Sequence, residues 1–315
     1  MNLKKPKFWD YKYPNIFAYL FLPLACLVQF FKILQKKNNN NINLKIKTIC
    51  VGNIYLGGTG KTSLCIKINK ILQRNKIKSC FIKKFYTNQI DEIKLLEKNG
   101  KIFSSSKRID ALKQAENENY EVAIFDDGLQ DNSIKYDVRF VCFNNINWIG
   151  NGMTIPSGPL REKIENIKNY KHIFLNGNLE NLSDIKKHIY KINPNINIYM
   201  GKYVPLDIEK FNKDKNYLVF SGIGNHQTFV SMLREYKFNI VKDIEFPDHY
   251  EYKNFDINKI HKLSDSLNCQ IITTEKDYLR LDKKKIYNIN FIKSELKILD
   301  EEKLISTILD KNENN

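Results

Sequence analysis

Short apolar runs that end in polar or glycine-rich turns recur along the chain and alternate with helical patterns. The first lies in "IKTICVGNIYLGGTGKTSL" (46–64), where a β-branched run leads through a glycine-rich turn into a helix. The apolar residues of that helix fall on one face, at Leu64, Ile68, Ile71 and Leu72. Residues 122–125 and the strings "HIFLNGN", "YLVFSGIGN" and "CQIITTEKD" each predict a buried strand, with helices expected at 228–236 and 256–267. This alternation is typical of an α/β fold.

The glycine-rich turn after the first strand has the composition of a phosphate-binding loop, although Tyr55 stands where the usual pattern has its first glycine. The remaining glycines still allow the backbone to wrap around phosphates, and the next helix points its free N–H groups at them. Lys61 would reach the β- and γ-phosphates, and the Thr62 hydroxyl would bind Mg²⁺. We therefore predict a phosphate-loop NTPase-like domain with a parallel sheet, whose ATP or GTP site consists of Gly57, Gly58, Thr59, Gly60, Lys61, Thr62 and Ser63.

A second acidic element follows in "YEVAIFDDGLQ", where the predicted strand 122–125 delivers Asp126 and Asp127 at its carboxyl end. Open α/β sheets bind ligands at that edge. Adjacent carboxylates there can hold Mg²⁺, directly or through water, in a phosphate-loop enzyme. The alternative is a simple turn, because Asp-Gly is a good turn dipeptide.

Residues 13–31, "YPNIFAYLFLPLACLVQFF", carry no charge. At ~1.5 Å per residue, a helix of this length only just reaches across the ~30 Å hydrocarbon core of a bilayer, and Pro23 would bend it. Lysines flank both sides, so no charge bias sets an orientation across the membrane. We expect a helix that dips into one leaflet and meets an anionic membrane surface; a buried core helix is the alternative. Residues 36–45 are predicted to form a flexible linker.

The composition adds less than these motifs. Among 315 residues, 51 Lys and Arg against 35 Asp and Glu give a net charge of +16. This excess favours anionic partners, but the chain is rich in Lys, Asn and Ile throughout, so the charge alone decides nothing. No aromatic-basic groove motif indicates a nucleic-acid partner. Six cysteines without a C-x-x-C pair indicate buried, reduced thiols in a cytosolic compartment.

Further strings occur in a fixed order along nearly the whole chain: "VGNIYLGGTGKT" (51–62), "DDGLQ" (126–130), "GNGMTIPSGPLRE" (150–162), "SGIGN" (221–225), "FPDHYEY" (246–252) and "TTEKD" (273–277). Together they resemble the tetraacyldisaccharide 4′-kinase family of the lipid A pathway. That family also lacks the first glycine of the loop, so Tyr55 is no defect. The resemblance implies ATP-dependent phosphorylation of the 4′-hydroxyl of an acylated glucosamine disaccharide 1-phosphate. The product would be lipid IVA, made at the cytoplasmic face of the bacterial inner membrane.

The resemblance also implies residue roles. Asp91 matches the family's catalytic base, and His249 matches the histidine that works with it. Arg161 would stabilise charge on the transferring phosphoryl group, and Glu162 would support the metal. Without the resemblance, His249 reads as a surface histidine, and Arg161 and Glu162 as an exposed ion pair.

Two departures from the family pattern lie near these positions. The family usually carries a glycine-rich segment where this chain reads "KKFYTNQ" (83–89), with Lys84 and Tyr86 as candidates for its arginine and tyrosine. The altered loop makes the assignment of Asp91 less direct than that of Lys61. The family also tends to have histidine where Asp131 stands, and an additional carboxylate there could change contacts to metal or substrate.

We expect three parts: a membrane-associated helix (1–35), the phosphate-loop kinase domain (44–205), and a smaller α/β domain (206–300) that closes over the active site. ATP would bind the first α/β domain, and closure would bring His249 toward the acceptor hydroxyl. The main rival is a phosphate-loop NTPase that acts in metal insertion or protein targeting. A degenerate, inactive membrane protein is a further alternative, because of the altered loop.

Overall fold

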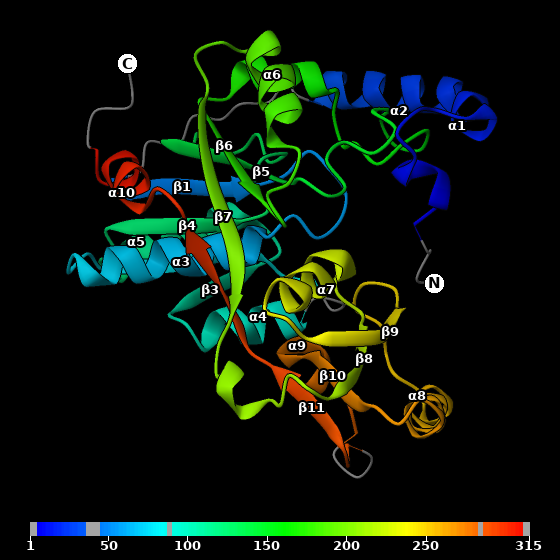
Figure 1. Cartoon of the computed structure of the whole chain (residues 1–315). Coiled ribbons are helices and arrows are strands. Elements are labelled where there is room, and N and C mark those ends of the chain that lie inside the picture. Colours follow the sequence, from blue (N-terminus) through cyan, green and yellow to red (C-terminus); the bar gives the residue numbers. More distant parts are fainter. Residues whose placement is uncertain (1–4, 36–44, 87–89, 283–285, 311–315) are drawn as a thin grey trace. The chain divides into compact units, whose positions relative to one another are not determined.

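The computed structural model describes residues 5–35, 45–86, 90–282 and 286–310 (Figure 1). The chain forms two units. The first unit is Met1–Gly201 together with Ile298–Asn315, and the second unit is Lys202–Lys297. The predicted ranges 44–205 and 206–300 differ from this division mainly at the C-terminus, where the last helix belongs to the first unit.

An eight-stranded sheet in the order β12-β7-β6-β5-β1-β4-β2-β3 organises the first unit. The central strand β1 (Lys47–Gly52) pairs in parallel with β4 (Val122–Asp126) on one side and β5 (Val138–Asn144) on the other. The other strands are β2 (Ser79–Lys84), β3 (Ile102–Ser105), β6 (His172–Asn176), β7 (Asn197–Pro205) and β12 (Ser294–Ile298). The pairings from β3 through β7 are all parallel, so the predicted parallel sheet is confirmed for these seven strands.

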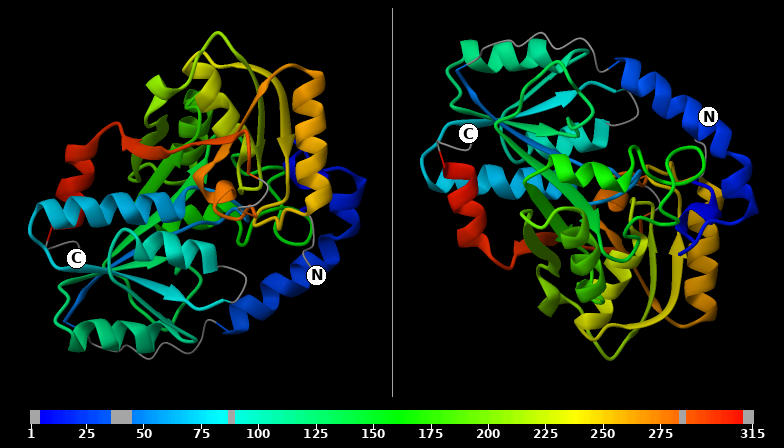
Figure 2. Two further views of the ribbon diagram at one scale, coloured as in Figure 1. Left: turned by 90° about the horizontal axis from the view of Figure 1, so that it is seen from below. Right: turned by 90° about the horizontal axis from the view of Figure 1, so that it is seen from above.

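Helices cover both faces of this sheet (Figure 2). α3 (Lys61–Arg74) connects β1 to β2, and α4 (Ile90–Glu97) connects β2 to β3, so both connections run toward the β3 edge of the sheet. α5 (Arg108–Asn117) runs the opposite way, from β3 back to β4. Because such crossovers are right-handed, the reversal puts α5 on the opposite face. The four apolar residues predicted for α3 are all buried, which confirms that helix and its face. The other elements are η3 (Ile164–Asn169), α6 (Leu182–Ile192) and α10 (Glu301–Leu309).

The second unit contains a four-stranded parallel sheet in the order β11-β10-β8-β9. Its strands are β8 (Asn216–Ser221), β9 (Asn239–Glu245), β10 (Gln270–Thr274) and β11 (Ile289–Ile292). Its helices are η4 (Ile208–Lys210), α7 (His226–Glu235), α8 (Asn254–Ser266) and α9 (Glu275–Tyr278). The predicted strands and the helices expected at 228–236 and 256–267 are confirmed. One apolar cluster packs β8 against α7, and a second packs the sheet against α8.

The apolar N-terminal segment forms two helices, α1 (Ile16–Leu20) and α2 (Leu22–Gln35), after a short turn of 3₁₀ helix, η1 (Lys7–Asp10). The break falls just before Pro23, where proline is tolerated in a first helical turn. Ala18 and Ala25 are fully buried, but many large apolar side chains are exposed: Ile16, Phe17, Tyr19, Leu20, Leu24, Leu27, Phe30 and Phe31. The alternative of a buried core helix is therefore wrong. Among the described residues, no helix is both long and apolar enough to cross a membrane.

The six cysteines are all free thiols. Cys50, Cys65, Cys80 and Cys142 are buried, as predicted from their apolar surroundings. Burial raises the pKa of the Cys50 thiol well above its usual value, because the charged thiolate would lose its hydration. Cys26 is exposed, so the prediction of burial is wrong for this residue, which lies on the half-exposed helix α2.

Candidate functional site

The predicted phosphate loop joins β1 to α3 in the first unit. Gly60 caps α3 with a φ of 77°, and Gly57 has a φ of 140°. Both angles lie in the left-handed region that residues with a side chain rarely adopt, so the turn needs glycine at both places. α3 begins at Lys61, which leaves the first N–H groups of the helix without partners inside the helix. The strand, glycine turn and helix predicted from the sequence are confirmed.

Two buried asparagines shape this loop. The Asn53 side chain donates to the carbonyl oxygens of Tyr55 at 2.5 Å and Gly57 at 3.2 Å. The Asn176 side chain, at the end of β6, donates to the carbonyl oxygen of Thr59 at 2.6 Å. Neither residue was predicted from the sequence, although Asn53 directly follows an apolar strand and Asn176 ends one, at the sheet edge where ligands bind.

Tyr55 ties the phosphate loop to the N-terminal segment. Its side chain is buried, and its hydroxyl donates to Asp10 Oδ1 at 2.7 Å. The Lys5 ammonium group contacts both the Tyr55 hydroxyl and Asp10, and lies 4.6 Å from the centre of the tyrosine ring. The residue that replaces glycine therefore has a structural purpose that a glycine could not serve.

Asp126 ends β4 beside the start of α3. Its Oδ2 accepts hydrogen bonds from the Thr62 hydroxyl at 3.1 Å and from Lys83 Nζ at 2.7 Å. Lys83 also binds Glu92 at 2.6 Å. Burial by itself would lower the pKa of Lys83, but the two carboxylates outweigh burial and raise it well above its usual value. Lys83 is thus a buried cation in this part of the site, which the sequence analysis missed.

The residues around Asp126 fit a magnesium ion. Asp126 Oδ1 is buried and has no hydrogen-bond partner within the described part of the chain. Mg²⁺ usually takes one or two carboxylates and completes its shell with water and substrate phosphates. The described residues contain no group of three or more His, Cys, Asp or Glu side chains that could hold a metal by themselves. Thr62 and Asp126 offer a partial shell of the kind that a phosphate-loop enzyme uses.

Asp127 takes different partners from its neighbour. Arg161 binds its carboxylate through both nitrogens, at 2.6 and 3.1 Å, and Lys61 Nζ lies 4.0 Å from Oδ1. Burial would raise the pKa of Asp127, but the charges of Lys61 and Arg161 outweigh it and hold the pKa well below its usual range. Asp127 therefore stays ionised and holds two predicted phosphate-binding cations beside the loop.

Glu162 has three hydrogen-bond donors around it. Its carboxylate accepts from Asn166 at 2.8 Å, Tyr170 at 3.2 Å and Gln130 at 3.3 Å. These contacts orient Glu162 next to Arg161, whose carbonyl oxygen accepts a hydrogen bond from Lys32 of α2 at 2.8 Å. The N-terminal segment thus contacts the site at two places, Tyr55 and Arg161.

Asp131, at the position where the resembling family tends to have histidine, forms an ion pair with Arg108 at 3.2 Å and accepts from the Ser133 hydroxyl at 2.6 Å. Burial would raise the pKa of Asp131, but these partners lower it below its usual value. Arg108 also donates to the carbonyl oxygen of Asp127 at 2.5 Å. The carboxylate of Asp131 is therefore paired with Arg108, a residue that was not predicted from the sequence.

Asp91 lies in the first turn of α4, but its side chain and residues 87–89 fall outside the described part of the structure. Of the two candidates in the altered loop, Lys84 lies with its Nζ 5.4 Å from the centre of the Tyr86 ring. The lysine that enters the site from this strand is Lys83.

His249 belongs to the second unit. It has a left-handed backbone with a φ of 57°, and its backbone N–H donates to the Gly222 carbonyl oxygen at 3.1 Å. Its Nδ1 lies 3.4 Å from Arg280 Nη2, and its Nε2 lies 3.8 Å from Asp248 Oδ1. The side chain is 26% exposed, so the ring remains accessible.

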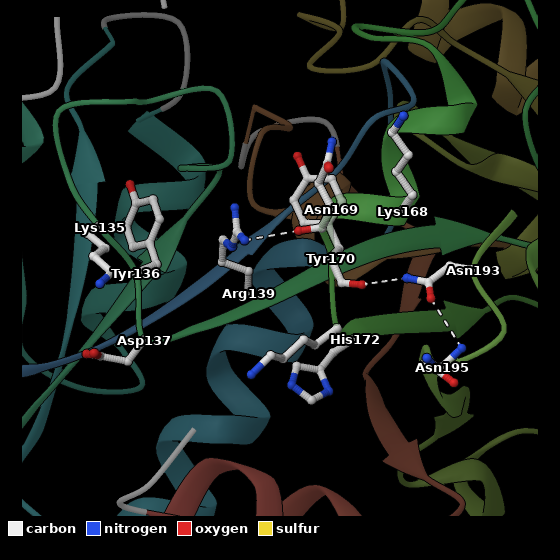
Figure 3. A pocket seen from close by; sticks show the side chains of 11 residues that line it. Lys135, Tyr136, Asp137, Arg139, Lys168, Asn169, Tyr170, His172, Asn193 and Asn195 are labelled. Atoms are coloured by element: carbon white, nitrogen blue, oxygen red, sulfur yellow. Dashed lines mark hydrogen bonds between the residues drawn. The ribbon is translucent and has the colours of Figure 1, made fainter. Parts of the chain in front are cut away.

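A separate cavity of about 480 Å³ opens in the first unit near the amino ends of β5 and β6 (Figure 3). Its walls include Lys135, Arg139, Tyr170 and His172. Arg139 lies over the Tyr170 ring and donates to the Asn169 carbonyl oxygen at 3.1 Å. None of the predicted site residues lines this cavity, because the phosphate loop lies at the carboxyl end of the parallel strands.

The glycine turn that caps α3, together with the strand-end aspartate beside its threonine, defines a phosphate-loop nucleotide-binding protein of the α/β class. A family model described as tetraacyldisaccharide-1-P 4′-kinase matches residues 17–101 and 88–313. The chain belongs to this family.

Individual relatives agree with the family match. A tetraacyldisaccharide 4′-kinase of Pelagibacter ubique (strain HTCC1062) is 59% identical over 315 residues, which cover 100% of both chains. One of Rickettsia canadensis (strain McKiel) is 33% identical over 300 residues, or 89% of each chain. The crystal structure of LpxK from Aquifex aeolicus in complex with ATP is similar in fold, with a TM-score of 0.65 and 20% identity over 93% of this chain and 98% of that one.

Proposed function

We propose that this chain transfers the γ-phosphate of ATP to the 4′-hydroxyl of a tetraacyldisaccharide 1-phosphate and so forms lipid IVA. The observation that carries the proposal is the pairing of Thr62 with Asp126 beside an intact phosphate loop, in a chain 59% identical along its whole length to a kinase of that name. Asp127 holds Lys61 and Arg161 next to the phosphate loop, as expected for cations that bind a polyphosphate.

The residues of the first unit divide the work on ATP. The N–H groups at the start of α3 would bind the phosphates, and Lys61, the first residue of that helix, would neutralise the β- and γ-phosphates. Arg161 would stabilise the negative charge that develops on the transferring phosphoryl group, and the ion pair with Asp127 holds Arg161 beside the phosphate loop. Thr62 and Asp126 would hold Mg²⁺, with Glu162 in support, and the ion would supply positive charge that offsets the charge of the phosphates.

Asp91 and His249 are the proposed acid–base residues for the acceptor. Proton removal from a sugar hydroxyl requires a base, and a carboxylate supported by an imidazole supplies one. Replacement of either residue by alanine is expected to lower kcat about 10²–10⁴-fold and to change KM little, since general base catalysis contributes within that range.

We further propose that α1 and α2 hold the protein on the cytoplasmic face of the inner membrane. Exposed apolar side chains on these helices, with lysines on both sides in the sequence, suit a helix that lies in an anionic interface. A lipid acceptor would be reached from that surface without leaving the membrane.

The test is transfer of labelled γ-phosphate from ATP to a tetraacylated disaccharide 1-phosphate in detergent with Mg²⁺, with Lys61→Ala as the blank. Labelled lipid that is absent from the blank would support the proposal. ATP hydrolysis without labelled lipid would favour the NTPase rival. No ATP turnover by folded protein would indicate that the altered loop at 83–89 has removed activity.

A further inference from the structure

Three sequence strings of the second unit meet at the carboxyl ends of β8 and β10. Gly222 of "SGIGN" donates its backbone N–H to Asp277 of "TTEKD" at 3.1 Å, and its carbonyl oxygen accepts from the backbone N–H of His249 in "FPDHYEY", also at 3.1 Å. Arg280, just beyond the last string, donates to Gly222 O at 2.9 Å and to Asp277 Oδ1 at 3.2 Å. Arg280 lies outside the sequence motifs, so no role was predicted for it.

Asp277 anchors this arginine firmly. The carboxylate is fully buried, and besides Arg280 it accepts hydrogen bonds from the Tyr252 hydroxyl at 2.9 Å and the Thr274 hydroxyl at 2.6 Å. Burial raises the pKa of Tyr252 well above its usual value, and the adjacent Asp277 raises it further, so the tyrosine remains a donor. A carboxylate with this many fixed donors has little freedom to turn.

The direction of the guanidinium group follows from these contacts. Nη1 of Arg280 is held by Gly222 O and Asp277 Oδ1, which restricts the direction of the planar group. Its Nη2 lies 3.4 Å from His249 Nδ1. The backbone N–H of His249 donates to Gly222 O, the same oxygen that accepts from Arg280, and to Asp248 Oδ1.

We propose that Arg280 is a positioning residue for His249 and holds its imidazole in the tautomer that carries the proton on Nε2. A guanidinium group has donors only, so the facing Nδ1 must accept, and a neutral ring then has its single proton on the other nitrogen. The importance of this contact for catalysis rests on the proposed function of His249; the contact itself does not.

The tautomer decides what His249 can do. With its proton on Nε2, the ring offers a hydrogen-bond donor at that nitrogen, which lies 3.8 Å from Asp248 Oδ1. Such a ring can orient and stabilise a carboxylate base, as the second member of an Asp–His pair, but it cannot take the proton of the acceptor hydroxyl through Nε2. Arg280 would therefore assign base chemistry to the carboxylate and a supporting role to the histidine.

Nitrogen NMR of the full-length protein tests the contact directly. The chain has five histidines, so a spectrum of ¹⁵N-histidine-labelled protein in mildly alkaline buffer contains few signals, and His249→Gln identifies the relevant pair. We expect a single tautomer with the proton on Nε2 in the unmodified protein. In Arg280→Met we expect the Nδ1 resonance to move and a mixture of tautomers to form. A proton on Nδ1 in the unmodified protein, or an unchanged Nδ1 resonance in Arg280→Met, would overturn the proposal.

Kinetics provide the second measurement. Arg280→Met should lower kcat for lipid phosphorylation about tenfold to a hundredfold with KM for ATP and lipid nearly unchanged, because orientation of a catalytic group contributes on this scale. Arg280→Lys retains the charge and serves if Arg280→Met does not fold. It should recover part of kcat, since lysine cannot reach both anchors and Nδ1. Arg234→Gln, an exposed arginine of the same unit, is the matched control and should behave as unmodified protein.

The two measurements separate the inference from the function on which it rests. If His249→Gln keeps full kcat while the NMR signals respond to Arg280→Met, the contact stands and the catalytic role of His249 is wrong. If His249→Gln lowers kcat but Arg280→Met changes neither kcat nor the Nδ1 resonance, the positioning role of Arg280 is wrong.

Discussion

Replacement of Lys83 by methionine is expected to destabilise the first unit strongly. The Lys83 side chain is 3% exposed and forms ion pairs with Asp126 at 2.7 Å and Glu92 at 2.6 Å. Methionine has a similar length, so the volume is largely kept and the lost charge dominates. Glu92 is 20% exposed and can turn toward water, whereas the Asp126 side chain is fully buried.

The magnitude follows from what Asp126 can do without its cation. Loss of one partner of a buried ion pair typically costs about 3–5 kcal/mol. We therefore expect Lys83→Met to lose about 3–5 kcal/mol, because the fully buried Asp126 carboxylate is left without its cation.

Urea unfolding monitored by tryptophan fluorescence measures this difference. Both tryptophans, Trp9 and Trp148, belong to the first unit, so the signal reports the unit that contains the substitution. Lys84→Met, one residue along the same strand and partly exposed, is the matched control and should change stability by less than about 1 kcal/mol. Lys83→Met with Asp126→Asn should regain most of the lost stability, because no buried charge is left unpaired. A loss no larger than that of the Lys84→Met control, or no recovery in the double variant, would refute the reasoning.

Three further predictions concern other parts of the site. Tyr55→Phe removes the hydroxyl that binds the N-terminal segment and should cost about 1 kcal/mol in urea unfolding, with faster proteolysis before residue 36; unchanged proteolysis would contradict the coupling. Leu20→Glu, at a 72% exposed position of α1, should weaken binding to anionic vesicles about tenfold or more in a flotation assay, whereas Leu279→Glu at a 63% exposed position of the second unit should not. Arg161→Lys loses the two-nitrogen contact to Asp127 and should lower the rate of labelled phosphate transfer about 10²-fold; a rate within twofold of normal would exclude a specific role for the guanidinium group.

The elements that position the nucleotide site could be predicted from the sequence because their signals are local. A β-branched run, a glycine turn and an apolar stripe lie within 46–64, so strand, loop and helix follow from neighbouring residues. The same holds for β4 and for the strands of the second unit, which are short apolar runs bounded by turn residues. The two-part break in the N-terminal helix also has a local cause in Pro23.

The charged partners inside the site could not be predicted in this way, because they depend on strand register. Ile82 of β2 pairs with Phe125 of β4 in the parallel ladder, and that register places Lys83 beside Asp126. From the sequence alone, "KK" at the end of a strand is typical of a solvated turn. Arg108 is similar: it begins a helix 23 residues before Asp131, and only the crossover of α5 brings the two together.

Backbone geometry explains why the two adjacent aspartates separate, although the sequence presents them as a pair. Asp126 is the last residue of β4 and keeps the strand register, so its carboxylate remains between Thr62 and Lys83. Asp127 has a left-handed backbone with a φ of 64°, which turns the chain out of the strand and directs its carboxylate to Lys61 and Arg161. Asx residues tolerate this conformation better than most, so an aspartate can occupy the turn at low cost. The two consecutive aspartates therefore have different roles: Asp126 lies where a metal would bind, and Asp127 holds the cations that would bind phosphate. The sharp turn between them creates both environments.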